Sequence, residues 1–228
     1  GRNWRNLTIP VVLAMLTALN VLYHLDGDLV GPADALRAAA YAITAMIALI
    51  GGRVMAPFTG NALGVKITET RFAGALETAS IIAVLATAIL AAAAPDSAVL
   101  GMAALCAGVV LGLRMIGWRS LATWRLPIVW VLHVGYVWLP IGYVMTGMAL
   151  IWGWVEPSAA LHALTAGAIG VMILAMATRA SLGHGGRALH ANAATVAAYV
   201  CVIVAALLRV FTPADWAEAA AVAWIVGY

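Results

Sequence analysis

Four of the five histidines stand in or beside long apolar runs, where they could bind a metal ion or haem. They are His24, His133, His162 and His184. A neutral imidazole nitrogen is the usual histidine ligand of haem iron, and it also binds copper. Polar groups within a membrane span are costly, so each histidine is a candidate functional residue. The alternative for His24 is a hydrogen bond at the interface, and for His133 it is packing against a neighbouring helix.

The histidines lie at two depths, judged from their distance along the chain to the nearest break. Nineteen residues separate His133 from Trp152 at the end of the same run, which corresponds to roughly 28 Å of helix. His162 lies only about one turn below that same surface, so one iron cannot join the two levels. We therefore expect His24 to pair with His162 and His133 with His184, or each to be completed by a histidine from outside this chain.

The elements that must position these histidines are membrane helices. Of the 228 residues, 65% are hydrophobic and 9% are charged, and the mean hydropathy is +1.03, whereas about a quarter of a soluble domain is charged. Apolar runs near or above the ~20 residues needed to cross a bilayer lie at 8–24, 35–52, 74–94, 98–117, 127–152, 158–178, 190–211 and 214–228. None has polar residues at every second position, as the strands of a membrane barrel would.

The sequence thus predicts an all-α fold, a polytopic transmembrane helix bundle with about seven complete spans and a truncated eighth. The last run stops at Tyr228 after 15 residues, too few to cross easily, and the chain begins at Gly1 rather than methionine. We therefore expect residues 1–228 to form a single membrane domain, the carboxy-terminal part of a longer chain. Cys106 and Cys201 are far apart and outside any CxxC motif, which predicts free thiols.

Positively charged residues collect on one side of the predicted helices. Ten of the 12 Lys and Arg residues fall on that side, only Arg37 and Arg209 lie on the other, and seven of the nine acids lie opposite the ten cations. By the positive-inside rule the basic side is cytoplasmic, which predicts a multi-pass protein with its Gly1 end in the cytoplasm. The net charge of +3 is a topology signal, and no basic stripe with aromatic residues indicates a nucleic-acid partner.

The longest polar stretch between runs follows the second predicted helix. We expect Arg53–Ala73 to be a loop of about twenty residues, in which Lys66–Phe72 forms a short interfacial segment. Glu77, one turn into the next run, is expected to pair with Arg53 or Arg71.

The stretch Thr178–Arg187 combines two arginines, one histidine and three glycines directly after an apolar run. It predicts a helix end at which Gly183 takes the left-handed conformation and Arg179 reaches the headgroups. The glycine-rich amides that follow are a candidate anion-binding nest.

Five stretches, in order along the whole chain, carry a family resemblance: Arg5–Leu7, Gly51–Leu63, His133–Trp138, Leu161–Gly170 and Thr178–Arg187. Together they resemble the NnrS family of bacterial haem- and copper-containing membrane proteins linked to nitric oxide stress. The resemblance implies haem b, with copper as a further cofactor, and a place in the bacterial inner membrane. It also implies preceding amino-terminal helices, which in the family carry a His-rich His-Glu motif that this chain lacks.

The resemblance extends to the expected site and function. It makes haem or metal ligands of the four histidines His24, His162, His133 and His184. From its place at the basic end, the stretch Thr178–Arg187 is expected to supply a partner for His133, or a clamp for the haem propionates through Arg179 and Arg187. The family is associated with nitric oxide metabolism and with protection from nitrosative stress, and the residues leave catalysis, binding and transport all open.

Two other classes of function remain as alternatives. Pro140 and Gly142 could break a helix as in secondary transporters, which would favour a carrier of a small ligand or metal complex. Surfaces rich in small residues, such as Gly108 and Gly112, allow close helix contacts, which would favour a non-catalytic subunit of a larger membrane assembly. An ordinary hydrolase or dehydrogenase is disfavoured, because the sequence has no GxSxG motif and no dinucleotide loop.

Overall fold

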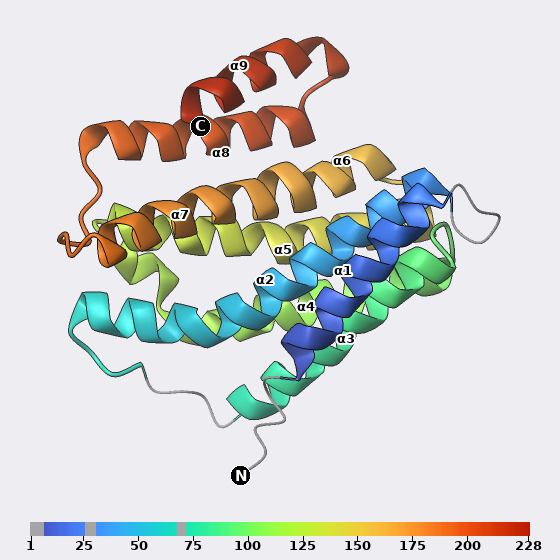
Figure 1. Cartoon of the computed structure of the whole chain (residues 1–228), viewed down its shortest axis with the longest axis horizontal. Helices are drawn as coiled ribbons and strands as arrows, with labels where there is room; N and C mark the ends of the chain where they lie inside the picture. The colour runs from blue at the N-terminus through green and yellow to red at the C-terminus, as the bar shows by residue number, and fades with distance from the viewer. Residues whose placement is uncertain (1–6, 26–30, 68–71) are drawn as a thin grey trace.

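The computed structural model describes residues 7–25, 31–67 and 72–228, which form helices and no strand (Figure 1). In chain order the elements are α1 (Thr8–His24), α2 (Pro32–Leu63), α3 (Ala73–Ala93), α4 (Ala98–Met115), η2 (Ile116–Trp118), η3 (Ser120–Thr123), α5 (Pro127–Trp152), α6 (Pro157–His162), η4 (Ala163–Gly170), α7 (Val171–His184), α8 (Ala193–Phe211), η5 (Ala214–Trp216) and α9 (Ala217–Gly227). The predicted all-α bundle is confirmed.

Six helical segments of the described chain are long and apolar enough to cross a membrane. They are Pro32–Leu63, Ala73–Ala93, Ala98–Trp118, Pro127–Trp152, Pro157–His184 and Ala193–Phe211. The helices α1, with 17 residues, and α9, with 11, are shorter apolar helices. The helix α9 is short, as the 15-residue last run predicts, whereas α1, counted above as complete, falls short of the ~20 residues that a crossing needs.

The helix α2 is longer than the sequence suggested. It continues past the expected end at residue 52 as far as Leu63, with Pro57 inside it, and ends at Gly64, whose φ of 64° is left-handed. The expected loop Arg53–Ala73 is therefore wrong for its first half. The interfacial segment expected at Lys66–Phe72 lies partly outside the described residues.

Contacts distant in sequence explain why α2 does not stop at its glycine pair. The ring of Tyr136 packs on Gly51, and the guanidinium of Arg114 packs on Gly52, each in the space that a Cβ would occupy. Glycine is a poor helix former, but here its lack of a side chain admits partners from α5 and α4. Tertiary packing thus overrides the local propensity.

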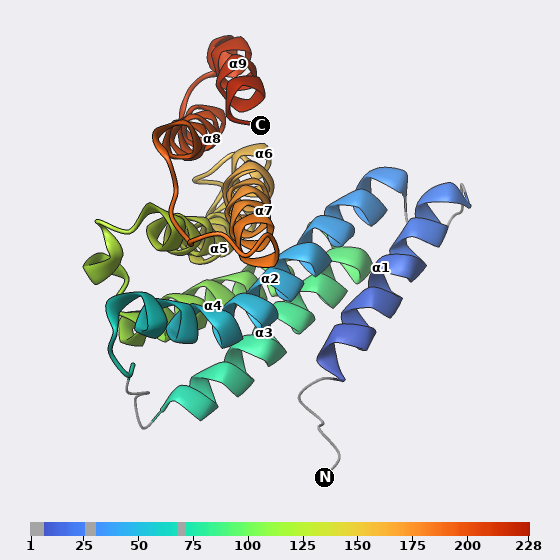
Figure 2. The ribbon, with the colours of Figure 1, turned by 60° about the vertical axis from the view of Figure 1, so that its left-hand side comes forward.

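The helix α5 lies at the centre of the bundle, in contact with α2, α4, α6, η4 and α7 (Figures 1 and 2). It is one continuous helix from Pro127 to Trp152, although Pro140 lies inside it. The helix break at Pro140 and Gly142 that would favour a transporter is therefore not present. Gly142 instead packs against the side chain of Leu164 in η4.

The closest approach between α4 and α5 is made by glycines. A Cβ on Gly108 would stand 3.0 Å from the carbonyl oxygen of Pro140, and a Cβ on Gly147 would stand 2.8 Å from that of Gly101. Gly112, the second glycine of the GxxxG pair, has 3.9 Å of room to its nearest neighbour. Small residues allow helix backbones to approach in this way. A side chain added at Gly147 would collide with both the backbone of Gly101 and the side chain of Leu105.

The Gly147→Val substitution is therefore expected to destabilise the bundle by about 2 kcal/mol, within the range found for overpacked cores. The physical reason is that the carbonyl of Gly101 cannot move aside without separating α4 from α5. Unfolding in detergent, followed by circular dichroism, measures the loss. Gly112→Val is the matched control and should unfold like the wild type, and equal losses in both variants would contradict the close contact at Gly147.

The helices α8 and α9 form a hairpin on the outside of the α6–α7 segment (Figures 1 and 2). The side chain of Asn192 caps α8 by accepting a hydrogen bond from the Thr195 N–H at 2.8 Å. The aromatic rings of Trp224 and Tyr228 stack with centroids 4.9 Å apart at the end of α9. The Tyr228 hydroxyl donates to the carbonyl oxygen of Gly170 at 2.6 Å, which ties the hairpin to η4.

Candidate functional site

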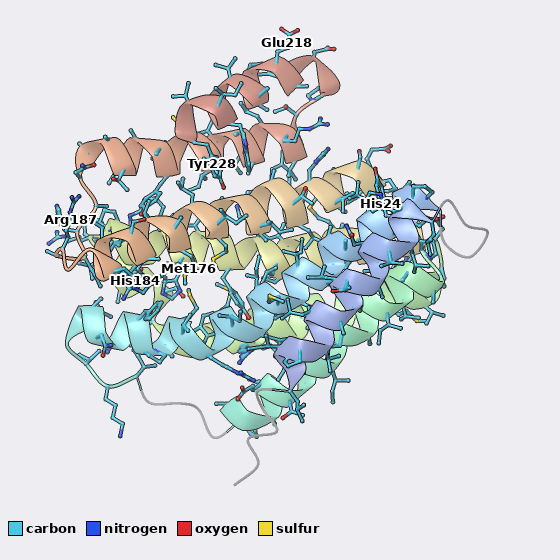
Figure 3. The ribbon with its side chains drawn as sticks, viewed as in Figure 1. His24, Met176, His184, Arg187, Glu218 and Tyr228 are labelled. Atoms are coloured by element: carbon cyan, nitrogen blue, oxygen red, sulfur yellow. The ribbon has the colours of Figure 1, made fainter. Side chains whose placement is uncertain are left out.

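The two outer histidines are not brought together. His24 is exposed at the end of α1 (Figure 3), and α1 stands at one edge of the molecule, well apart from α8 and α9 (Figure 2). His162 ends α6 and lines cavities that face α8. His24 is not among the residues that line those cavities. The two share one end of the bundle, but not one site.

His133 is buried, with 5% of its surface exposed, and both of its ring nitrogens have hydrogen-bonding partners. Its Nε2 lies 2.8 Å from Oγ1 of Thr59 on α2, and its Nδ1 lies 2.9 Å from Oγ of Ser120 on η3. The Thr59 hydroxyl donates its only proton to the carbonyl oxygen of Met55 at 2.8 Å, so it must accept from Nε2–H. Nδ1 then accepts from the Ser120 hydroxyl, which defines a neutral imidazole that joins α2, α5 and η3.

The His133→Ala substitution is expected to lower the free energy of unfolding by about 2 kcal/mol, because it removes two hydrogen bonds, the one that Thr59 Oγ1 accepts and the one that the Ser120 hydroxyl donates. Ser120→Ala removes one hydrogen bond and should cost only about 1 kcal/mol. Detergent unfolding of the three proteins side by side measures both losses. A His133→Ala variant as stable as the wild type would show that this network does not support the fold.

The stretch Thr178–Arg187 ends α7 in a way that differs from the expectation. The helix runs through Gly183 to His184, and the left-handed residue is Gly186, with φ 64°. The Gly186 N–H donates to the Gly183 carbonyl and the Arg187 N–H to the Leu182 carbonyl, at 3.2 and 2.9 Å, which is a Schellman cap. These two amides close the helix, so they do not form the expected anion nest.

The remaining predicted residues are spread over the cytoplasm-facing end suggested by the charge pattern. His184 and Arg187 are exposed at the end of α7 (Figure 3). Arg179 is half-buried, and its guanidinium carbon lies 3.9 Å from the ring centroid of Phe58 on α2. Twenty-two residues separate His184 from His162, roughly 33 Å of helix, so this end and the His162 end are separate places.

The His162 groove, as we call it, consists of two adjoining cavities that share His162 and Arg209. One has a volume of about 640 Å³ and lies between η4, α8 and α9, and the other has about 670 Å³ and lies between α5, α6 and the end of α8. Small-molecule and cofactor sites commonly measure about 300–1,000 Å³. The imidazole of His162 is half-buried, and among the described residues no side chain or backbone group hydrogen-bonds to it.

The walls of the His162 groove are mostly apolar. Trp224 and Tyr228 of α9 line the first cavity, and Met145 and Met148 of α5 line the second. Arg209 of α8 is the one cation that lines both. A flat apolar molecule with an acidic edge fits such a lining, because the ring faces the apolar walls and the acid faces a guanidinium.

The backbone directly after His162 is π-helical, from Ala163 to Gly170. Such segments are rare and occur frequently at functional sites. Gly167 packs on the ring of Trp138, and Gly170 packs on the ring of Trp224. The π-helical turns thus bring η4 close to both α5 and α9 beside the histidine.

Sequence reasoning named His162 as a candidate ligand but did not identify most of the residues around it. Arg209 was counted only as one of the two cations on the acidic side. Its position there, opposite the other ten cations, is the sequence signal that could have identified it as a candidate binding residue. Met172 and Met176 follow His162 along the same segment, but Met172 is buried against Gly135 of α5. The methionines that share a cavity with His162 are Met145 and Met148 on another helix, which no local spacing reveals.

A site for a metal ion alone would need several side chains close together, in contrast to a single histidine ligand. Over residues 7–25, 31–67 and 72–228, no three His, Cys, Asp or Glu side chains come together to hold a metal ion. Cys106 and Cys201 are free, as expected, although Cys106 is exposed rather than buried. A haem needs only one or two protein ligands, so the His162 groove remains a candidate for it.

Comparison with known proteins adds one match. The family model described as NnrS protein matches residues 1–228, the whole of the chain. No curated protein and no solved structure matches the chain.

Proposed function

Because the chain belongs to the NnrS family of nitric-oxide-related membrane proteins, we propose that it binds haem b in the His162 groove. The observation that carries this proposal is the half-buried imidazole of His162, which lines two cavities and accepts or donates no hydrogen bond within the described chain. An imidazole nitrogen with a free lone pair is what haem iron requires.

The residues around His162 fit the rest of a haem. Apolar walls from η4, α8 and α9 suit the porphyrin, and Arg209 suits a propionate carboxylate through paired N–H donors. Met145 and Met148, in the adjoining cavity, are thioether groups that could hold the haem iron together with His162. Bound haem would supply an iron centre that binds nitric oxide and exchanges single electrons.

The proposal assigns limited roles to the other predicted residues. His133 is engaged with Thr59 and Ser120, and Arg179 lies over Phe58, so we propose structural roles for both. Copper is a further cofactor associated with the family. We propose no separate copper site, since no three His, Cys, Asp or Glu side chains of the described residues come together.

We further propose a multi-pass orientation in the bacterial inner membrane with the Gly1 end in the cytoplasm. Six apolar helices fit a lipid bilayer as the partner. Ten of 12 cations lie on the side of the Gly1 end, which supports the orientation through the positive-inside rule. On this orientation the His162 groove opens near the periplasmic surface. Further amino-terminal helices of the same protein, and other membrane subunits, are proposed partners.

The test is the haem content of the complete natural protein, purified from haem-supplied cells. We expect a Soret band, close to one haem b per chain in the pyridine haemochrome assay, and a shift of the Soret band when nitric oxide is added to the reduced protein. Intact protein from the same cells without a Soret band would overturn the proposal. A Soret band that nitric oxide does not shift would leave haem binding standing but remove the link to nitric oxide.

A further inference from the structure

A second cavity, of about 450 Å³, lies between α2, α3 and α4 and is lined by charged groups. Arg53 of α2, Glu77 of α3 and Arg114 of α4 face it, with Trp118 of η2 beside them. We call it the arginine pocket. Ionisable residues within membrane-spanning helices are rare and mark functional sites by default, and the proposed haem site uses none of these three.

The guanidinium of Arg114 is held in place on two sides. Its Nη1 donates to the carbonyl oxygen of Ala48 at 3.3 Å and to Oγ of Ser80 at 3.1 Å, and its flat face lies on Gly52. The side chain is only 8% exposed. Its Nη2 lies 3.9 Å from Oε1 of Glu77, which is beyond hydrogen-bonding distance. The guanidinium is therefore oriented in advance.

Among the described residues that line the arginine pocket, two carry a positive charge and one carries a negative charge. Glu77 Oε1 lies 3.8 Å from Nε of Arg53 and 3.9 Å from Nη2 of Arg114, so one carboxylate faces two guanidiniums at ion-pair rather than hydrogen-bond distance. In a low-dielectric site an excess cation attracts an anion strongly.

The arginine pocket lies at the depth of lipid headgroups. The helix α3 begins at Ala73, one turn before Glu77, and α4 gives way to η2 directly after Arg114 and Met115. At the rim, Phe72 and Ile116 are 56% and 75% exposed, and both line the pocket. The charged groups inside the pocket could contact a lipid phosphate, and the apolar residues at its rim could contact the acyl chains of the same lipid.

We propose that the arginine pocket binds a phosphate group, that of an anionic membrane lipid or of a free phosphate compound. Guanidinium groups bind phosphate oxygens through paired N–H donors, and basic pockets between membrane helices on the cytoplasmic side bind anionic headgroups. Arg53 and Arg114 are the binding residues. Glu77 holds them apart and limits the affinity for the anion.

Native mass spectrometry of the complete protein in neutral detergent tests this proposal. Phosphatidylglycerol, phosphatidylcholine and inorganic phosphate are the three probes. For the wild type we expect phosphatidylglycerol to be retained at least fivefold more than phosphatidylcholine. Arg53→Gln should reduce that retention at least fivefold, and Arg125→Gln, which changes an exposed arginine outside the pocket, should leave it unchanged.

The Glu77→Gln variant tests whether misfolding explains the loss of lipid in Arg53→Gln. Misfolding would lower retention in both variants, whereas we expect the folded fraction of Glu77→Gln to retain the anionic lipid several-fold better than the wild type. Competition by millimolar inorganic phosphate would assign the site to free phosphate compounds, whereas retention that phosphate does not displace would assign it to a lipid. Equal retention of the two lipids by the wild type, or retention of phosphatidylglycerol unaltered by both Arg53→Gln and Glu77→Gln, would overturn the proposal.

Discussion

The His162→Ala variant is expected to lose its Soret band while it remains folded. Loss of an outer partner of a metal ligand already lowers metal affinity about 10–100-fold, so loss of the ligand itself should lower haem content by more than about tenfold. The fold should persist because His162 is half-buried at the end of α6 and ties no helices together through hydrogen bonds. Haem per chain from the pyridine haemochrome assay, with helicity from circular dichroism, measures both.

Two other histidines serve as matched controls for His162→Ala. His24 and His184 are exposed at helix ends, so His24→Ala and His184→Ala should keep the haem content of the wild type. Arg209→Gln should keep the Soret band but weaken haem retention, because it removes a charge-assisted contact and not the iron ligand.

A different ranking of these variants would identify a different site. If His184→Ala abolished the Soret band and His162→Ala preserved it, the haem would lie at the cytoplasmic level and the His162 groove would be wrong. The same conclusion would follow from loss in His133→Ala, provided that the protein stayed folded. The two depths of the histidines make these outcomes exclusive for a single haem.

The helical spans could be predicted from composition. Only 9% of the residues are charged, which indicates a membrane protein, and in lipid the backbone hydrogen bonds are satisfied only by helices or a closed barrel. The two depths of the histidines also followed from the rise per residue. The predictions failed where residues distant in sequence determine the local structure. The helix α2 continues through Gly51 and Gly52 because Tyr136 and Arg114 occupy the space beside them, and neither partner is near in sequence.

The role of Gly51 and Gly52 could not be predicted from the sequence. Tyr136 and Arg114 reach over Gly51 and Gly52 to the same carbonyl oxygen, that of Ala48, each at 3.3 Å. Gly51 and Gly52 therefore lie at a junction of α2, α4 and α5. The π-helical turns after His162 were equally hidden, because apolar runs of small residues carry no periodic signal that separates a π-helix from an α-helix.

The Glu77→Gln substitution is expected to be the most destabilising single change near the arginine pocket. It removes the carboxylate that faces both Arg53 and Arg114 and leaves two guanidiniums to repel each other in a site of low dielectric. Removal of one partner from a buried ion pair commonly costs 3–5 kcal/mol. Glu77 is 20% exposed along its side chain, so we expect the lower end, about 3 kcal/mol, in detergent unfolding.

A double variant separates lost charge balance from lost packing. Glu77→Gln combined with Arg114→Met removes one charge of each sign, so the pair should be more stable than Glu77→Gln alone, since well-packed apolar replacements of buried ion pairs are often neutral. Anionic lipid should also restore part of the stability of Glu77→Gln, because a bound phosphate replaces the missing negative charge. If neither the second substitution nor phosphatidylglycerol raised the stability of Glu77→Gln, the arginines would not be held together by charge, and the excess positive charge of the pocket would have no energetic consequence.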